Sequence, residues 1–187
     1  MRIARCHLTS ISPYSQSKMI RAERGERETD KEHEKRVWRE RSHYNAEGQC
    51  YIPPTAFKNM IAEAAKFTPR TGPTGGKSTW TKNFEAGILV VDPLMLGVHV
   101  DEMQSEMLNV PSRGRPGPGP RVDKIFPLFE KWSGWVEFLV YDDSITEEIF
   151  ELYLREAGSF IGVGRFRPRN RGFYGRFKID KIEWLET

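Results

Sequence analysis

The sequence predicts an α+β fold in which an antiparallel sheet packs against two helices. Short alternating or β-rich segments occur at the amino end, in the middle and at the carboxyl end of the chain. Two segments between them repeat apolar residues at helical spacing. The elements follow one another as strand, helix, strand, strand, helix, strand, and this order sets the predicted fold class.

Length and composition favour one domain over residues 1–187 with two large insertions, at about 10–50 and about 99–133. Only 38% of residues are hydrophobic and 29% are charged, yet 12% are aromatic, which suffices for a modest core beneath polar insertions. The formal net charge of +3 says little about partners. Its distribution is more informative, because the C-terminal loop is purely basic.

The two cysteines, Cys6 and Cys50, form neither a disulfide framework nor a metal-binding spacing, so we expect no metal and no cofactor. The longest aliphatic run, Ile88–Val91, is too short to cross a bilayer, and no membrane partner is expected. The chain starts without the pattern of a signal peptide. We therefore expect a reduced, cytoplasmic protein of a prokaryotic or phage-infected cell.

The first strand is predicted at residues 2–9, where side chains alternate between a buried face and a face that carries Arg5 and His7. Residues 10–49 then mix charges of both signs and predict an exposed insertion outside the core, either a hairpin or a mobile loop. The cluster in it that most resembles a ligand site comprises Arg36, Trp38, Arg39 and Arg41. A solvated charged arm explains the same pattern.

Pro53-Pro54-Thr55 opens a helix that we expect to reach about Phe67. Lys58 lies in its first turn, where the helix dipole disfavours a cation; either a nearby ligand anion or an ordinary exposed lysine accounts for it. A centrally buried strand follows at Ile88–Val91. The glycine-rich segment before that strand lacks the spacing of a P-loop, which excludes a nucleotide triphosphatase of that kind.

The carboxyl half begins with a predicted loop at 114–120, and a third strand follows at 135–141. Ser144 and Glu147 form a capping-box pattern that starts the second helix, and Gly158 is suited to end it. The last strand is expected to start near Gly172. The resulting βαββαβ order is that of a ferredoxin-like fold, whose sheet has an open face that RNA-recognition (RRM-like) modules use.

Residues 162–178 carry the strongest functional signal. Two glycine clusters bracket a seven-residue spacer, and no acidic residue occurs between its first arginine and Lys178. Arginine forks match phosphate oxygens, and aromatic faces accept stacked bases. The sequence therefore predicts a polyanion-binding loop, with a solvated basic turn as the alternative. Its candidate contacts are Arg165, Phe166, Arg167, Arg169, Arg171, Tyr174, Arg176 and Lys178.

This loop resembles the glycine-rich loop of the repeat-associated mysterious protein (RAMP) superfamily of CRISPR-associated proteins. Gly162-Val163-Gly164 matches the family's first glycine cluster, and Gly172-Phe-Tyr-Gly175 stands for the second with one extra residue. The loop also follows the last helix and precedes the last strand, as it does in the family. The proline-led helix with Lys58 is a further likeness.

Within that superfamily the chain looks most like the backbone subunit that polymerises along guide RNA in multisubunit effector complexes for antiviral defence. The resemblance implies binding of single-stranded, crRNA-like RNA, a homo-oligomer along that RNA, and other effector subunits and target nucleic acid as partners. None of the histidines is set beside an evident partner in the sequence, so we expect binding without a catalytic residue.

Two alternatives stay open. A second branch of the superfamily consists of metal-independent endoribonucleases that use a histidine, for which His7 is the candidate here, and some backbone subunits cut target RNA with an arm aspartate, for which Asp30 is the candidate. The other is a solitary single-strand nucleic-acid-binding protein of phage or mobile-element origin.

Overall fold

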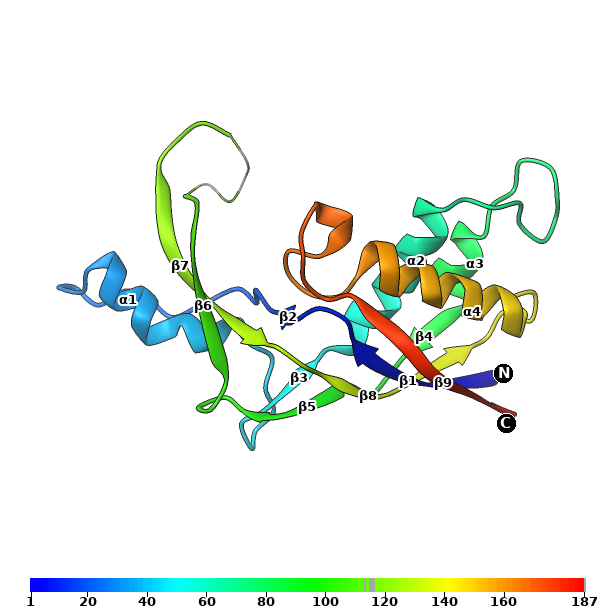
Figure 1. The fold of residues 1–187 in the computed structure, drawn as a ribbon, viewed down its shortest axis with the longest axis horizontal. Helices are drawn as coiled ribbons and strands as arrows, with labels where there is room; N and C mark the ends of the chain where they lie inside the picture. The colour runs from blue at the N-terminus through cyan, green and yellow to red at the C-terminus, as the bar shows by residue number, and fades with distance from the viewer. Residues whose placement is uncertain (113, 115–116, 187) are drawn as a thin grey trace.

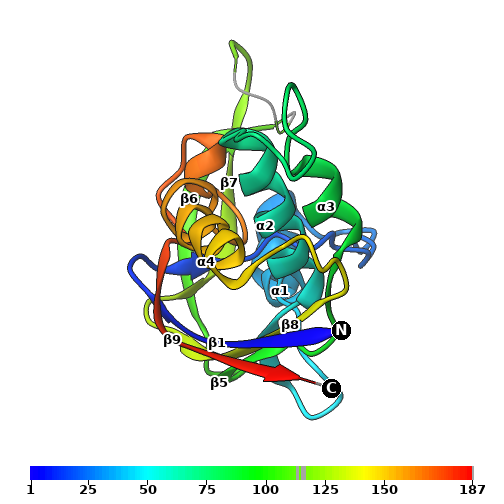
Figure 2. The same ribbon diagram turned by 90° about the vertical axis from the view of Figure 1, so that its right-hand side faces the viewer.

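The computed structural model describes residues 1–112, 114 and 117–186 of the chain. Its largest sheet has four antiparallel strands in the order β4-β8-β1-β9. These are β1 (Arg2–Ser10), β4 (Ile88–Val90), β8 (Ser133–Val140) and β9 (Phe177–Glu186). The helices α2 (Pro54–Phe67), α3 (Thr81–Ala86) and α4 (Glu147–Glu156) lie on one face of this sheet (Figure 2). The fold is therefore mixed α+β with antiparallel sheets, as predicted at that level.

The core lies between the four-stranded sheet and its helices. On β1 the side chains of Ala4, Cys6 and Leu8 are fully buried, so the predicted strand and its inward face are confirmed. The predicted helix at 54–67 is confirmed as α2, which buries Phe57 and Met60 against the sheet. The opposite face of the sheet has no helix over it in the described part of the chain (Figure 2).

Two smaller sheets and a further helix extend the molecule away from this core (Figure 1). A three-stranded sheet has the order β2-β7-β6, and β3 pairs with β5. Their bounds are β2 (Tyr14–Ser15), β3 (Gln49–Ile52), β5 (Leu94–His99), β6 (Gln104–Pro111) and β7 (Arg121–Phe129). The remaining helical segments are α1 (Asp30–Val37), the 3-10 turns η1 (Trp38–Arg41) and η3 (Pro168–Asn170), and the π-helical turn η2 (Ala157–Ile161).

The first insertion is exposed over most of residues 17–36, as expected, but it contains a helix where a hairpin or mobile loop was expected. Thr29 and Glu32 form a reciprocal capping box that begins α1. Val37 at the end of this helix and Trp38 directly after it are buried, with side chains that are 2% and 7% exposed. One apolar pair after a charged helix is enough to anchor the segment.

The second insertion is likewise more ordered than the loop expected from the sequence, because β6 and β7 pair over eight positions. The loop predicted at 114–120 includes residues 115 and 116, which lie outside the described residues. The strand at Ile88–Val90 occupies an edge of the four-stranded sheet rather than the predicted central position.

Three predicted boundaries shift. The N-cap of α4 is Thr146, whereas the Ser144 hydroxyl donates to Asp142 at 2.6 Å. Gly158 does not end the helix, because the chain continues through the π-helical turn while Gly158 packs tightly under Phe177. The last strand starts at Phe177, so the residues after Gly172 belong to the loop.

None of the helices in the described part of the chain combines the length and the apolar character that a membrane span requires.

Candidate functional site

The glycine-arginine loop, residues 162–176, connects η2 to β9 and is tightly held by its own backbone. Gly164 has φ +80°, and a Cβ there would lie 2.3 Å from the Tyr14 ring. A Cβ at Gly172 would lie 1.7 Å from the Phe166 carbonyl oxygen. The loop is further fixed to the segment after β1, because the Arg165 amide donates to the Ser15 carbonyl at 2.8 Å. These glycines therefore permit close backbone packing within the protein.

On one side of the loop, two predicted arginines converge on a single carboxylate of α2. Arg167 Nη2 lies 2.7 Å from Glu63 Oε2, and Arg169 Nε lies 3.2 Å from Glu63 Oε1. The Arg169 guanidinium also lies over the Phe67 ring, 5.0 Å from its centroid. One carboxylate that bridges two guanidinium groups occupies the position that a phosphate would take between them.

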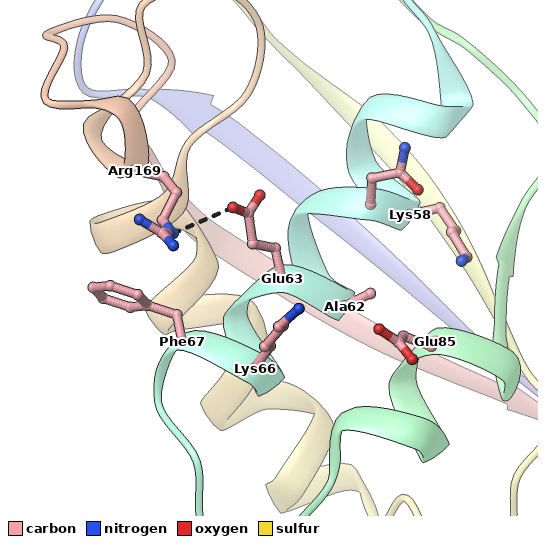
Figure 3. A pocket seen from close by; sticks show the side chains of 8 residues that line it. Lys58, Ala62, Glu63, Lys66, Phe67, Glu85 and Arg169 are labelled. Atoms are coloured by element: carbon pink, nitrogen blue, oxygen red, sulfur yellow. Dashed lines mark ion pairs between the residues drawn. The ribbon is translucent and has the colours of Figure 1, made fainter.

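Arg169 lines an open pocket of about 670 Å³, which we call the α2 pocket (Figure 3). Lys58 and Lys66 line it from α2, and Glu85 lines it from α3. No ion pair of Lys58 or Lys66 occurs among the described residues, so both ammonium groups are available to a ligand. The fold thus brings together Lys58 and Arg169, which were predicted separately.

Lys66 was not among the candidate residues predicted from the sequence, although it lies two helical turns after Lys58 on the same face of α2. The residues that line the pocket are Lys58, Asn59, Ala62, Glu63, Lys66, Phe67, Glu85 and Arg169.

On the other side of the loop, Arg165 and Phe166 line a smaller cavity of about 380 Å³. Phe166 takes a left-handed backbone conformation, with φ 53°, and its side chain is 50% exposed. Arg165 stacks on the Phe126 ring of β7, with 3.4 Å from Cζ to the centroid. Burial lowers the pKa of the Arg165 guanidinium. Arg171 is exposed and forms no side-chain hydrogen bond or ion pair within the described chain.

Two predicted contacts in this region are engaged inside the protein. Tyr174 is 9% exposed, its hydroxyl donates to Glu106, and burial raises its pKa to about 12. Arg176 donates from Nε to the Ser159 carbonyl at 3.2 Å. These two side chains hold the loop against its surroundings.

Arg5, His7 and Lys178 lie apart from the α2 pocket, on the open face of the four-stranded sheet. His7 Nδ1 lies 3.1 Å from Asp180 Oδ2, and Lys178 Nζ lies 3.0 Å from Asp180 Oδ1. Hydrogen bonds from Thr9, Lys178 and His7 lower the pKa of Asp180 to about 2. Next to this group, Arg5 stacks over Trp135 at 4.5 Å, and the His7 ring meets the same indole edge-on at 5.2 Å. Arg5 also faces the carboxylates of Glu137 and Glu183 at 3.5 Å.

The predicted arm residues mainly make internal contacts. Arg36 Nε pairs with Glu28 at 2.7 Å, and Arg39 lies over the buried Trp38 ring at 4.5 Å. Arg41 is 5% exposed; it pairs with Glu34 at 2.6 Å and donates to the Ile125 carbonyl at 2.8 Å. The predicted arm cations Arg36 and Arg41 are therefore engaged in ion pairs within the protein.

Asp30 is exposed at the start of α1, where it pairs with Arg24. No group of three or more His, Cys, Asp and Glu side chains suited to a metal ion occurs within residues 1–112, 114 and 117–186.

The sequence matches no protein-family model, and no curated protein resembles it significantly.

Proposed function

We propose that the chain is a non-catalytic subunit that binds single-stranded RNA across the glycine-arginine loop and α2. The observation that carries this proposal is the convergence of Lys58, Lys66 and Arg169 on the open α2 pocket, with Arg167 paired to Glu63 of the same lining. Two lysines and one arginine around one opening, with a second arginine paired to its Glu63, suit successive phosphates of a strand. On the other side of the loop, the exposed Phe166 ring offers a face for a base.

The arrangement of the elements supports a ferredoxin-like topology and, with it, the resemblance to the RAMP superfamily. In the order β4-β8-β1-β9, the outer strands follow α2 and α4, both of which cover one face. The glycine-arginine loop lies between α4 and β9, the position that the family pattern requires. On this proposal, several copies assemble along a guide RNA together with other effector subunits.

Arg167→Ala combined with Arg169→Ala tests the binding role directly. We expect weaker binding of a labelled oligouridylate and a log-log salt slope shallower by about 1.4, since each neutralised phosphate contributes about 0.7 for single strands. The matched control is Arg24→Ala with Arg155→Ala, which removes two exposed arginines that pair with Asp30 and Glu151 and do not line the α2 pocket. Equal affinity and equal slope for the two double variants would refute the loop assignment.

The same preparation distinguishes the endoribonuclease alternative, which the His7–Asp180 pair on the open sheet face favours. We expect RNA incubated with the protein in EDTA to stay intact on a denaturing gel. Cleavage that His7→Ala abolishes would instead identify a metal-independent nuclease. Size-exclusion chromatography with and without RNA, followed by sequencing of any RNA that co-purifies, tests the oligomer and separates a guide-bound subunit from a solitary single-strand binder.

A further inference from the structure

The smaller cavity beside the loop, which we call the Lys18–His43 pocket, differs from the α2 pocket in its charge. It is lined from the amino-terminal end of α2, from the segment after β2, from the segment after η1 and from the loop itself. None of its lining residues is acidic. They are Tyr14, Gln16, Ser17, Lys18, His43, Pro53, Ala56, Gly164, Arg165, Phe166 and Asn170.

The polar side chains of this pocket are fixed in place by the protein. Gln16 is 2% exposed; it donates to the Tyr51 carbonyl at 2.7 Å and accepts from the His43 amide. The His43 ring packs against the Tyr51 ring with centroids 5.8 Å apart. Lys18 is exposed above it, with Nζ 5.9 Å from the Tyr44 ring centroid. The imidazole and the ammonium group are thus held near each other with no carboxylate between them in the pocket lining.

Arg165 supplies the strongest indication of a missing anion. Its Nη1 is buried and has no hydrogen-bond partner within the described chain. A buried cationic donor without an acceptor is costly, and the stack on Phe126 satisfies the face of the guanidinium but not its N–H groups. The nearest negatively charged side chain that influences it is Glu106, whose carboxylate already accepts from Tyr174. An anion in the pocket, which Arg165 itself lines, would offset the charge of this guanidinium.

The helix and the exposed aromatic ring complete the site. Pro53, the N-cap of α2, makes no side-chain cap hydrogen bond, so the positive end of a 14-residue helix opens into the same space. Phe166 lines the pocket with its ring half exposed, and its left-handed backbone is fixed by the close approach of Gly172. The left-handed backbone of Phe166 costs conformational energy, and residues in such conformations cluster at functional sites. Here it places an exposed aromatic ring beside the cationic side chains, where a base could stack on it.

We propose that the Lys18–His43 pocket is a nucleotide subsite that binds one phosphate of a single strand between Lys18, His43 and Arg165, with the attached base stacked on Phe166. The inference rests on the proposed function and extends it, because it places a second contact on the opposite side of the loop from the α2 pocket. A strand that crosses the loop would then contact both pockets.

Two variants test the subsite with the same labelled oligouridylate. Lys18→Gln is expected to weaken binding about tenfold, as for one charge-assisted hydrogen bond, and to make the salt slope shallower by about 0.7. Phe166→Leu keeps the apolar volume but removes the ring, and is expected to weaken binding at least about fivefold with an unchanged salt slope. Matched controls are Lys77→Gln, on the exposed segment between α2 and α3, and Phe173→Leu, the 58%-exposed aromatic of the same loop outside the pocket.

A direct probe separates this inference from the proposed function. Uridine monophosphate and inorganic phosphate are titrated into the protein while the His43 ring protons are followed by NMR. We expect both to shift the His43 signals, uridine monophosphate to bind more tightly, and Phe166→Leu to remove that difference. If Lys18→Gln and Phe166→Leu bind the oligonucleotide as the wild type does while the Arg167/Arg169 variant does not, the subsite is refuted and the proposed function stands. If the wild type binds no oligonucleotide and neither small ligand shifts His43, both are refuted.

Discussion

On the proposed function, Glu63 occupies the place between two loop arginines that a bound phosphate would take. Its replacement is therefore predicted to lower the stability of the free protein and to raise its affinity for RNA. In the free protein its carboxylate pairs with Arg167 and Arg169, and the three side chains are between 21% and 43% exposed. Glu63→Gln removes this competitor but keeps the size of the side chain. The free protein should lose stability, and the affinity for RNA should rise by a similar free energy.

The magnitude follows from the exposure of the pairs. Half-exposed ion pairs contribute about 0.2–1 kcal/mol each, so the two together stabilise the free protein by about 1 kcal/mol. The affinity of Glu63→Gln for an oligouridylate is therefore expected to rise about fivefold. The melting temperature should fall by about 2–4 °C for a chain of this size.

Fluorescence anisotropy at low and high KCl measures the affinity, and thermal unfolding followed by circular dichroism measures the stability. Glu151→Gln is the matched control: it changes the net charge equally, but its partner is Arg155 on α4, and neither residue lines the α2 pocket. If Glu63→Gln bound RNA no better than Glu151→Gln, or bound it less well, Glu63 would orient the loop for binding rather than compete with the ligand. The reasoning that places a phosphate between these arginines would then be wrong.

Two predictions concern stability. The pKa of Asp180 is lowered to about 2 in the folded chain against an ordinary value of about 3.9, so its stabilising contribution is present above about pH 4 and is lost as the pH falls toward 2. Urea unfolding at several pH values should show this loss in the wild type and a flatter profile in Asp180→Asn; parallel profiles would contradict it. Glu34→Gln should lower the free energy of unfolding by about 3–5 kcal/mol, because it leaves the nearly buried Arg41 without its carboxylate. Glu26→Gln, an exposed change on the same arm, is the control, and equal urea midpoints for the two would refute the role of the pair.

The local periodicity of the sequence predicted β1 and α2 with their buried faces, because a half-buried strand and an amphipathic helix are each encoded by neighbouring residues. The burial of Trp38 was not predictable in this way. Between residues 26 and 41 twelve residues are charged, and Val37 and Trp38 are the large apolar ones. The packing of η1 against β7 and the core buries the indole. A single apolar residue in a charged segment carries no period from which burial could be inferred.

In the candidate site, too, local features were predictable from the sequence and tertiary contacts were not. Arginines in a glycine-bracketed loop were recognisable as a cluster, since they are adjacent in the sequence. Their pairing with Glu63 and their approach to Lys66 depend on how the loop crosses α2, which no local pattern encodes. Lys18 and His43 come from two separate segments of the arm and meet Arg165 only in the folded chain.

Phe126 shows why the loop and the two insertions form one structural unit. Two guanidinium groups lie near its ring, with Arg165 of the loop at 3.4 Å and Arg41 of the arm at 5.1 Å from the centroid. Arg41 has Glu34 as a counter-ion, whereas Arg165 has none in direct contact. Two like charges held around one ring repel each other, and Arg41 indeed contributes to the lowered pKa of Arg165. If the pocket binds a phosphate as proposed, an anion beside Arg165 would relieve that repulsion, and the insertions that fix Phe126 and Arg41 would then favour its binding.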